Sequence, residues 1–163
     1  MPLLRRRPVP AAVRAVPLEP GDRRLDWAGT SDGLVVVASE AGLTLPGRPL
    51  LEWRLVEKAT WQRPRLVVFE VAEVEGTGAS YSLELQEGGD LPEVVRAKVM
   101  DSVVWSSHVR LGAHGGVRVV GRRRRGWEVF DWQLVYDAGT DIADVGVRRE
   151  AEQALAAARR AVG

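Results

Sequence analysis

Hydrophobic and polar residues alternate most clearly over residues 80–85, which read Ser-Tyr-Ser-Leu-Glu-Leu. A period of two is typical of a strand with one buried and one solvated face. Short apolar runs bounded by turn residues predict further strands upstream, at residues 25–28, 34–38, 43–45, 50–56 and 65–71. The stretch from 31 to 71 therefore reads as a tight antiparallel meander, with a tryptophan-bearing connection before its last strand.

The periodicity changes at residue 90 and predicts a helix. Asp90 offers an N-cap acceptor, and Glu93 places a carboxylate at the third helical position. An apolar stripe with a spacing of four residues follows, made of Leu91, Val95 and Val99. We expect a middle helix at about residues 91–102.

The remaining chain predicts three strands and a second helix. Apolar runs indicate strands at residues 103–111, 116–120 and 127–136. In the last of these, one face carries Phe130, Trp132, Leu134 and Tyr136. Asp141 and Asp144 then provide capping residues before a segment rich in strong helix formers. We expect a C-terminal helix at about residues 142–161.

These elements predict an α+β fold with an antiparallel, strongly curved sheet of about 8–9 strands and two helices. Residues 1–20 are rich in proline and arginine and show no period, so we expect an extended or disordered tail. Residues 21–163 are expected to form a single domain.

The composition excludes several kinds of chemistry. The chain of 163 residues has no cysteine and two histidines, so disulfides, thiolate nucleophiles and cysteine or multi-histidine metal sites are not expected. Its net charge of +1 gives no global field for nucleic acid or membranes. We predict no catalytic residues, no metal and no cofactor. Prolines interrupt the N-terminal apolar residues and no transmembrane segment is expected, which favours a cytoplasmic protein.

The strongest local charge feature is the run Arg122, Arg123, Arg124 and Arg125, between Gly121 and Gly126. Its position between two predicted strands places it at a hairpin tip. One interpretation is an anion-binding site that contacts phosphates, with Trp127 stacking on a base. The other is a solvated hairpin end that deters edge pairing. An arginine-rich composition, with two lysines among 23 basic residues, favours the second.

Tryptophan supplies six of the ten aromatic residues. In a small β-rich domain most tryptophans belong to the core, but Trp61 and Trp127 lie in or beside predicted loops. These two are the candidates for surface contact with a peptide or sugar, because large rigid rings bind with little loss of entropy. Adjacent Ser107 and His108 point to opposite faces of a strand, so we interpret His108 as an exposed strand residue.

The meander at residues 34–71, with LLEWRLVEKATW leading into RLVVFEV, resembles the opening strands of bacterial pleckstrin-homology-like domains. The chain is also similar to uncharacterised actinobacterial proteins that carry LPEVV, GGVRVV and W-x-x-V-Y-D-x-G elements. These elements are residues 91–95, 115–120 and 132–139. The first resemblance implies a β-barrel over about residues 23–103 closed by the middle helix, with a hairpin and helix added at 104–163. It does not imply lipid binding, because the first loop, residues 29–33, has one acid and no base.

The leading functional hypothesis is a non-catalytic binding or scaffold domain that contacts a protein partner or a second copy of itself. The alternative is binding of nucleic acid or another anionic ligand through the arginine run at residues 122–125. An enzyme with an unrecognised site is the third and least supported hypothesis.

Overall fold

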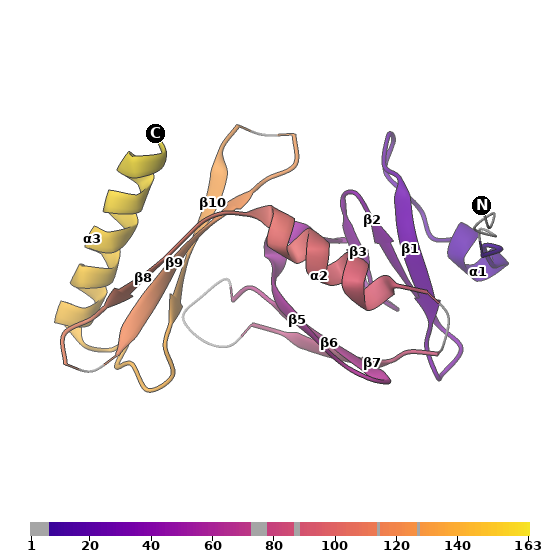
Figure 1. The fold of residues 1–163 in the computed structure, drawn as a ribbon, viewed down its shortest axis with the longest axis horizontal. Helices are drawn as coiled ribbons and strands as arrows, with labels where there is room; N and C mark the ends of the chain where they lie inside the picture. Colours follow the sequence, from indigo (N-terminus) through magenta and orange to yellow (C-terminus); the bar gives the residue numbers. More distant parts are fainter. Residues whose placement is uncertain (1–6, 73–77, 87–88, 114, 127) are drawn as a thin grey trace, which may run out of the picture. The chain divides into compact units, whose positions relative to one another are not determined.

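The computed structural model describes residues 7–72, 78–86, 89–113, 115–126 and 128–163. Within them the chain is α+β, as expected, with ten strands in three antiparallel sheets, a middle helix and a C-terminal helix (Figure 1). The chain divides into two compact units, residues 1–71 with 78–99, and residues 72–77 with 100–163. The expected single domain over 21–163 stays a prediction.

The first unit contains two of the sheets. One has the strand order β1-β2-β3-β4, with β1 at Arg24–Gly29, β2 at Val35–Ser39, β3 at Gly42–Thr44 and β4 at Leu51–Glu52. The other has the order β5-β6-β7, with β5 at Val56–Gln62, β6 at Arg65–Glu70 and β7 at Ser80–Glu84. An isolated bridge pairs Thr30 with Leu85. No closed barrel forms among the described residues.

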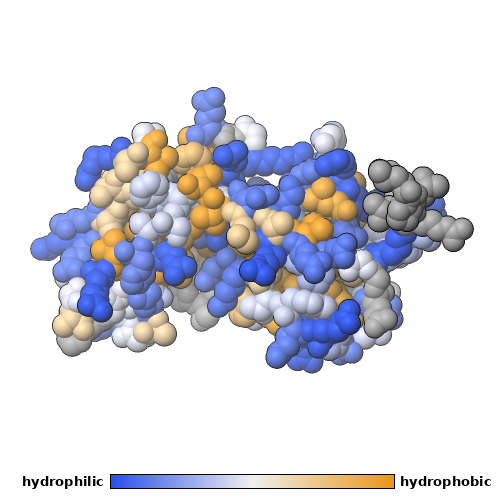
Figure 2. All heavy atoms as spheres, in the orientation of Figure 1, coloured by the Kyte–Doolittle hydropathy of each residue, from blue (hydrophilic) through white to orange (hydrophobic). Residues whose placement is uncertain are grey.

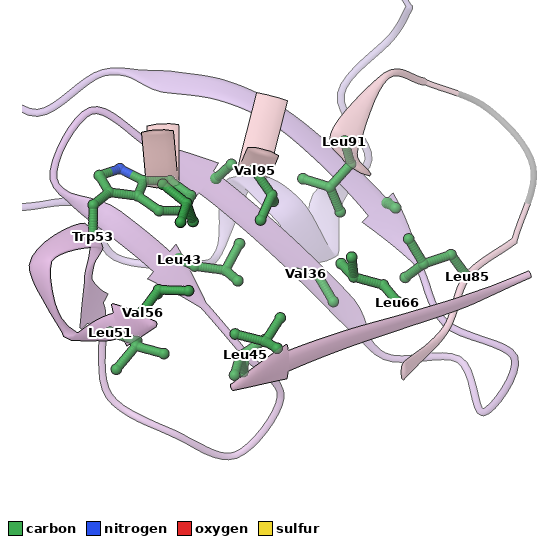
Figure 3. Close-up of a cluster of buried hydrophobic side chains, with 14 residues drawn as sticks. Val36, Leu43, Leu45, Leu51, Trp53, Val56, Leu66, Leu85, Leu91 and Val95 are labelled. Carbon is green, nitrogen blue, oxygen red and sulfur yellow. The ribbon is translucent and has the colours of Figure 1, made fainter. Parts of the chain in front are cut away.

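Helix α2, at Leu91–Ser102, confirms the predicted middle helix and packs against both sheets of the first unit. Leu91 and Val95 point toward strand residues such as Leu66 in Figure 3. Full burial of a leucine or valine side chain stabilises a fold by about 1.5–3 kcal/mol. The apolar stripe read from the sequence is therefore the surface that fixes α2 to the sheets.

The run at residues 50–56, predicted as one strand, is divided between two sheets. A short 3₁₀ turn at Trp53–Leu55 separates β4 from β5. Trp53 is buried in this turn, and its indole Nε1 donates a hydrogen bond to the Ser39 carbonyl at 2.9 Å. The connection expected at Trp61 is instead part of β5, an edge strand of exposed residues without a clear apolar period.

The N-terminal segment differs from the extended or disordered tail that we expected. Ala11–Arg14 form a short helix, α1, and Val13 is completely buried. The guanidinium carbon of Arg7 lies 3.3 Å from the ring centre of Trp27, a cation–π contact. The small apolar residues of α1 pack on β2 in spite of the neighbouring prolines.

The second unit is a three-stranded sheet with a helix on one face. Its strand order is β10-β9-β8, with β8 at Val103–Arg110, β9 at Gly116–Arg123 and β10 at Phe130–Tyr136. Helix α3, at Val145–Val162, begins three residues later than predicted and packs on all three strands. Its N-cap Asp144 accepts a hydrogen bond from the Val147 amide at 3.0 Å, as the capping pattern indicated.

Strand β9 extends to Arg123, beyond the predicted end of this strand at residue 120. Gly121 is paired with Trp105 on β8 and Trp132 on β10. A Cβ atom at this glycine would lie 3.1 Å from the Trp132 ring and 3.3 Å from Cβ of Trp105. The glycine therefore allows two tryptophans to approach across the strand.

Among the described residues, no helix has the length and apolar character needed to span a membrane.

Candidate functional site

The structure does not place the four arginines at 122–125 on one surface. Arg122 and Arg123 belong to β9, where consecutive side chains point to opposite faces. Arg122 is 4% exposed, and its Nη1 donates to Ser102 Oγ at 2.8 Å. Arg123 and Arg125 are exposed and Arg124 is half-buried. Arg122 thus has a structural contact that a shared phosphate site would have to break.

Of the two tryptophans predicted at the surface, Trp61 is 42% exposed on β5. It is paired with the buried Leu66 of β6, so its ring lies on the apolar side of that sheet, at the edge. Trp127 lies outside the described residues. The structure therefore brings no second described candidate next to Trp61.

His108 is exposed on β8, as interpreted from the sequence, and its partner is a carboxylate. His108 Nε2 lies 2.7 Å from Oδ2 of Asp137, at the end of β10. Sequence analysis missed this pair, because the two residues are 29 positions apart and meet through the pairing of three strands. Within the part of the chain that the structure describes, no group of three histidine, aspartate or glutamate side chains could hold a metal ion.

A groove of about 550 Å³ lies along β7 in the first unit, and we call it the β7 groove. This volume is within the range of ligand sites in proteins. Two loops border it opposite β7, the β1–β2 loop and the β3–β4 loop. The lining residues from these loops are Thr30, Ser31, Asp32, Leu45, Pro46 and Arg48.

The outer edge of β7 presents backbone hydrogen-bonding groups to this groove. The Ala79 carbonyl accepts a hydrogen bond from the Glu70 amide of β6 at 2.8 Å. The Leu85 amide donates to the Pro64 carbonyl, in the turn before β6, also at 2.8 Å. Because orientation alternates along a strand, the backbone groups of Ser80 and Ser82 point away from β6. The Glu84 carbonyl does so too, since it accepts from the Ser31 amide at 2.9 Å. Among described residues, Ser80 and Ser82 have no backbone partner on that side.

A polar cluster lies at the Ser80 end of the groove, around the ring of Tyr81. Its hydroxyl donates to Glu70 Oε2 at 2.7 Å. The guanidinium of Arg48 lies over the Tyr81 ring, 4.4 Å from its centre, and forms an ion pair with Glu70 at 3.9 Å. Gly47, with a φ of 70°, lets the β3–β4 loop turn just before Arg48. These contacts hold an arginine and an aromatic ring beside the unpaired edge.

On the face of the molecule drawn in Figure 2, hydrophilic residues separate the hydrophobic ones into several groups.

No protein-family model matches the chain, and neither a curated protein nor a solved structure matches it.

Proposed function

We propose that the protein is a non-catalytic binding module that receives an extended segment of a protein partner in the β7 groove. The observation that carries the proposal is the unpaired outer edge of β7, at Ser80 and Ser82, beside a groove of about 550 Å³. Backbone donors and acceptors repeated every second residue match the spacing of another extended chain. Addition of a strand to such an edge is a recurring mode of peptide recognition.

The two sides of the groove would contribute different parts of recognition. Backbone bonds to β7 would give affinity without regard to sequence, and pockets for alternate side chains would give selectivity. The buried Leu45 and the half-buried Leu83 and Tyr81 offer apolar contacts to the groove. Arg65 and Arg48 at the rim offer donors to an acidic or amide side chain of the peptide.

The resemblance to pleckstrin-homology-like domains is part of this proposal. A four-stranded sheet, a three-stranded sheet and a helix packed on both support it. The helix in question is the middle helix, α2.

The proposal is tested by Ser82→Pro, with Ser82→Ala as the matched control. Proline removes the outward amide and blocks an added strand, while the bonds of β7 to β6 involve the neighbouring residues. Alanine removes only the hydroxyl and keeps the amide. The probe is a library of random twelve-residue peptides displayed on phage, selected on the wild-type chain and followed by affinity measurements on the enriched peptides.

We expect enriched peptides whose affinity falls roughly tenfold or more in Ser82→Pro, the effect of one or two lost hydrogen bonds. Ser82→Ala should bind them nearly as well as the wild type. Peptides that bind both variants equally, or a selection that enriches nothing, would contradict the proposal. Thermal unfolding of each variant verifies that the first unit remains folded.

Self-association is the competing occupant of the same edge. It predicts that the wild type forms a dimer and that Ser82→Pro is a monomer. Sedimentation analysis of both chains over a range of concentrations measures their oligomeric state. The nucleic-acid alternative gains no support from the arginine run, because Arg122 is buried and bonded to Ser102.

A further inference from the structure

A second pocket, of about 420 Å³, lies at the end of the sheet in the second unit. His108, Arg110 and Asp137 contribute side chains to it, and the β8–β9 loop contributes Gly112, Ala113 and Gly115. We call it the His108 pocket. Two sequence elements without an assigned role meet beside it, because GGVRVV supplies Gly115 and Gly116 and W-x-x-V-Y-D-x-G supplies Asp137.

Gly116 lies on β9 next to the His108–Asp137 pair that lines the pocket. A Cβ atom at this position would lie 2.5 Å from Asp137 Oδ2 and 2.7 Å from His108 Nε2. Real Cβ atoms do not approach oxygen or nitrogen so closely, so a Cβ at this position would force the His108 or Asp137 side chain, or both, to move. The absence of a side chain at Gly116 leaves room for the 2.7 Å contact between them.

Two arginines share this face of the sheet with His108. The register pairs His108 with Arg118 and Arg110 with Gly116, so the side chains of His108, Arg118 and Arg110 emerge on one side. Arg110 and Arg118 are diagonal neighbours, which ordinary sheet geometry places about 7–8 Å apart and somewhat closer at Cβ. Both are exposed. Among the described residues, neither forms an ion pair or a side-chain hydrogen bond.

The charges on this face are unbalanced. Asp137 is the acidic residue among those that line the pocket, and one of its oxygens is engaged by His108. Like charges at neighbouring positions of a sheet repel each other. A bound anion would remove that repulsion and would satisfy guanidinium groups whose fork geometry suits phosphate.

We infer that the His108 pocket binds an oxyanion, namely the phosphate group of a small phosphate monoester. Arg110 and Arg118 supply charge and donors to the phosphate oxygens. His108, oriented by Asp137 through Nε2, presents Nδ1 to the ligand and donates from it when both ring nitrogens carry protons. The pocket of about 420 Å³ leaves room for the small organic group of the ester. This site is independent of the β7 groove.

The test uses two probes, inorganic phosphate and glycerol phosphate, titrated into the full chain at constant ionic strength. Binding is followed by the amide resonances of β8 and β9 in two-dimensional NMR. Arg110→Ser and Arg118→Ser remove one guanidinium each. Arg123→Ser, an exposed arginine further along β9, is the matched control. Constant ionic strength prevents general screening from imitating a specific effect.

We expect saturable shifts around His108 with both probes, and tighter binding of glycerol phosphate. The dissociation constant should rise roughly tenfold or more in Arg110→Ser and Arg118→Ser, as for loss of a charge-assisted hydrogen bond, and stay unchanged in Arg123→Ser. Shifts that do not saturate, or equal weakening in all three variants, would overturn the inference. Saturable binding of inorganic phosphate alone would overturn the ester as ligand.

Gly116→Ala provides a second readout, next to the His108–Asp137 pair. It should separate His108 from Asp137 and weaken both probes, and the His108 ring resonances report that separation directly. If the variant does not fold, Asp137→Asn replaces it, with the same change in the ring resonances expected. Unchanged His108 resonances in the folded variant would show that the pair is not formed in solution and would contradict the proposed role of Asp137.

Discussion

In the first unit, fourteen buried apolar side chains from both sheets and α2 form one cluster (Figure 3). In the second unit, the described cluster has three buried residues, Leu111, Val117 and Ala151. The second unit also relies on close approaches, as at Gly121, and on the buried bond from Arg122 to Ser102. The first unit is therefore stabilised mainly by packed apolar side chains, whereas small residues and polar contacts also stabilise the second unit.

This difference bears on where each unit can bind. The first unit encloses its apolar side chains and leaves a backbone edge unpaired at β7. The second unit covers one sheet face with α3 and leaves charged side chains on the other, at Arg110 and Arg118. The first therefore suits an extended chain, and the second suits a small charged ligand.

The largest expected effect tests the core of the first unit. Leu66→Ala should lower the free energy of unfolding by about 2–5 kcal/mol, because Leu66 is 1% exposed and its removal leaves a cavity. Leu134→Ala, at a partly buried position in the second unit, should lower it by less. Urea denaturation of both variants measures the difference. Equal losses would contradict the inference that the first unit has the larger and more stabilising apolar core.

The next effect separates two consecutive arginines of β9. Arg122→Ala should lower the free energy of unfolding by about 1–3 kcal/mol, because it removes a buried hydrogen bond to the Ser102 hydroxyl. Arg123→Ala removes an exposed side chain and should change it by less than about 0.5 kcal/mol. Thermal and urea unfolding distinguish the two. If both variants behave alike, the polar contact does not stabilise the second unit as we argue.

The smallest effect concerns a polar contact of the first unit. Hydrogen bonds from Lys98 of α2, and then from Arg23, hold the pKa of Glu40 below its ordinary value. A lowered folded-state pKa stabilises the protein above the unfolded pKa, and this contribution disappears as the pH falls through the folded pKa. Glu40→Gln should therefore cost about 0.2–1 kcal/mol at neutral pH, as for a surface ion pair, and almost nothing in acid.

The free energy of unfolding of the wild type and of Glu40→Gln, measured at neutral pH and in acid, tests this effect. A penalty that persists in acid would mean that the glutamine disturbs packing instead of charge. A loss of free energy of unfolding larger than that of Arg122→Ala would contradict the comparison of the two units. Polar contacts would then stabilise the first unit, with its larger apolar core, more than the second.

Local periodicity explains which elements the sequence could predict. The stripe of Leu91, Val95 and Val99 and the alternation at residues 80–85 each reflect a buried face within one element, so α2 and β7 were predicted closely. Strand β5 lacked such a signal, because an edge strand of exposed residues has no strict apolar period. Its place in the second sheet depends on the turn made by buried Trp53.

The candidate sites depended on pairing between strands, which local patterns do not specify. The strand was predicted to end at residue 120, but Gly121 allows two tryptophans to approach, so β9 continues and places Arg122 and Arg123 on opposite faces. The unpaired edge of β7 is likewise a property of the sheet order. The meeting of His108 and Asp137 requires the register across Gly116.

The anchored N-terminal segment has a practical consequence for anyone who prepares this protein. Its proline-rich composition invites removal of the first twenty residues before crystallisation or labelling. Such a truncation would delete Val13, which is completely buried, and would strip Arg7 from the face of Trp27. The shortened chain would expose a fresh apolar surface over β2, and its aggregation would then be mistaken for natural self-association. Affinity tags are better joined ahead of this segment than substituted for it.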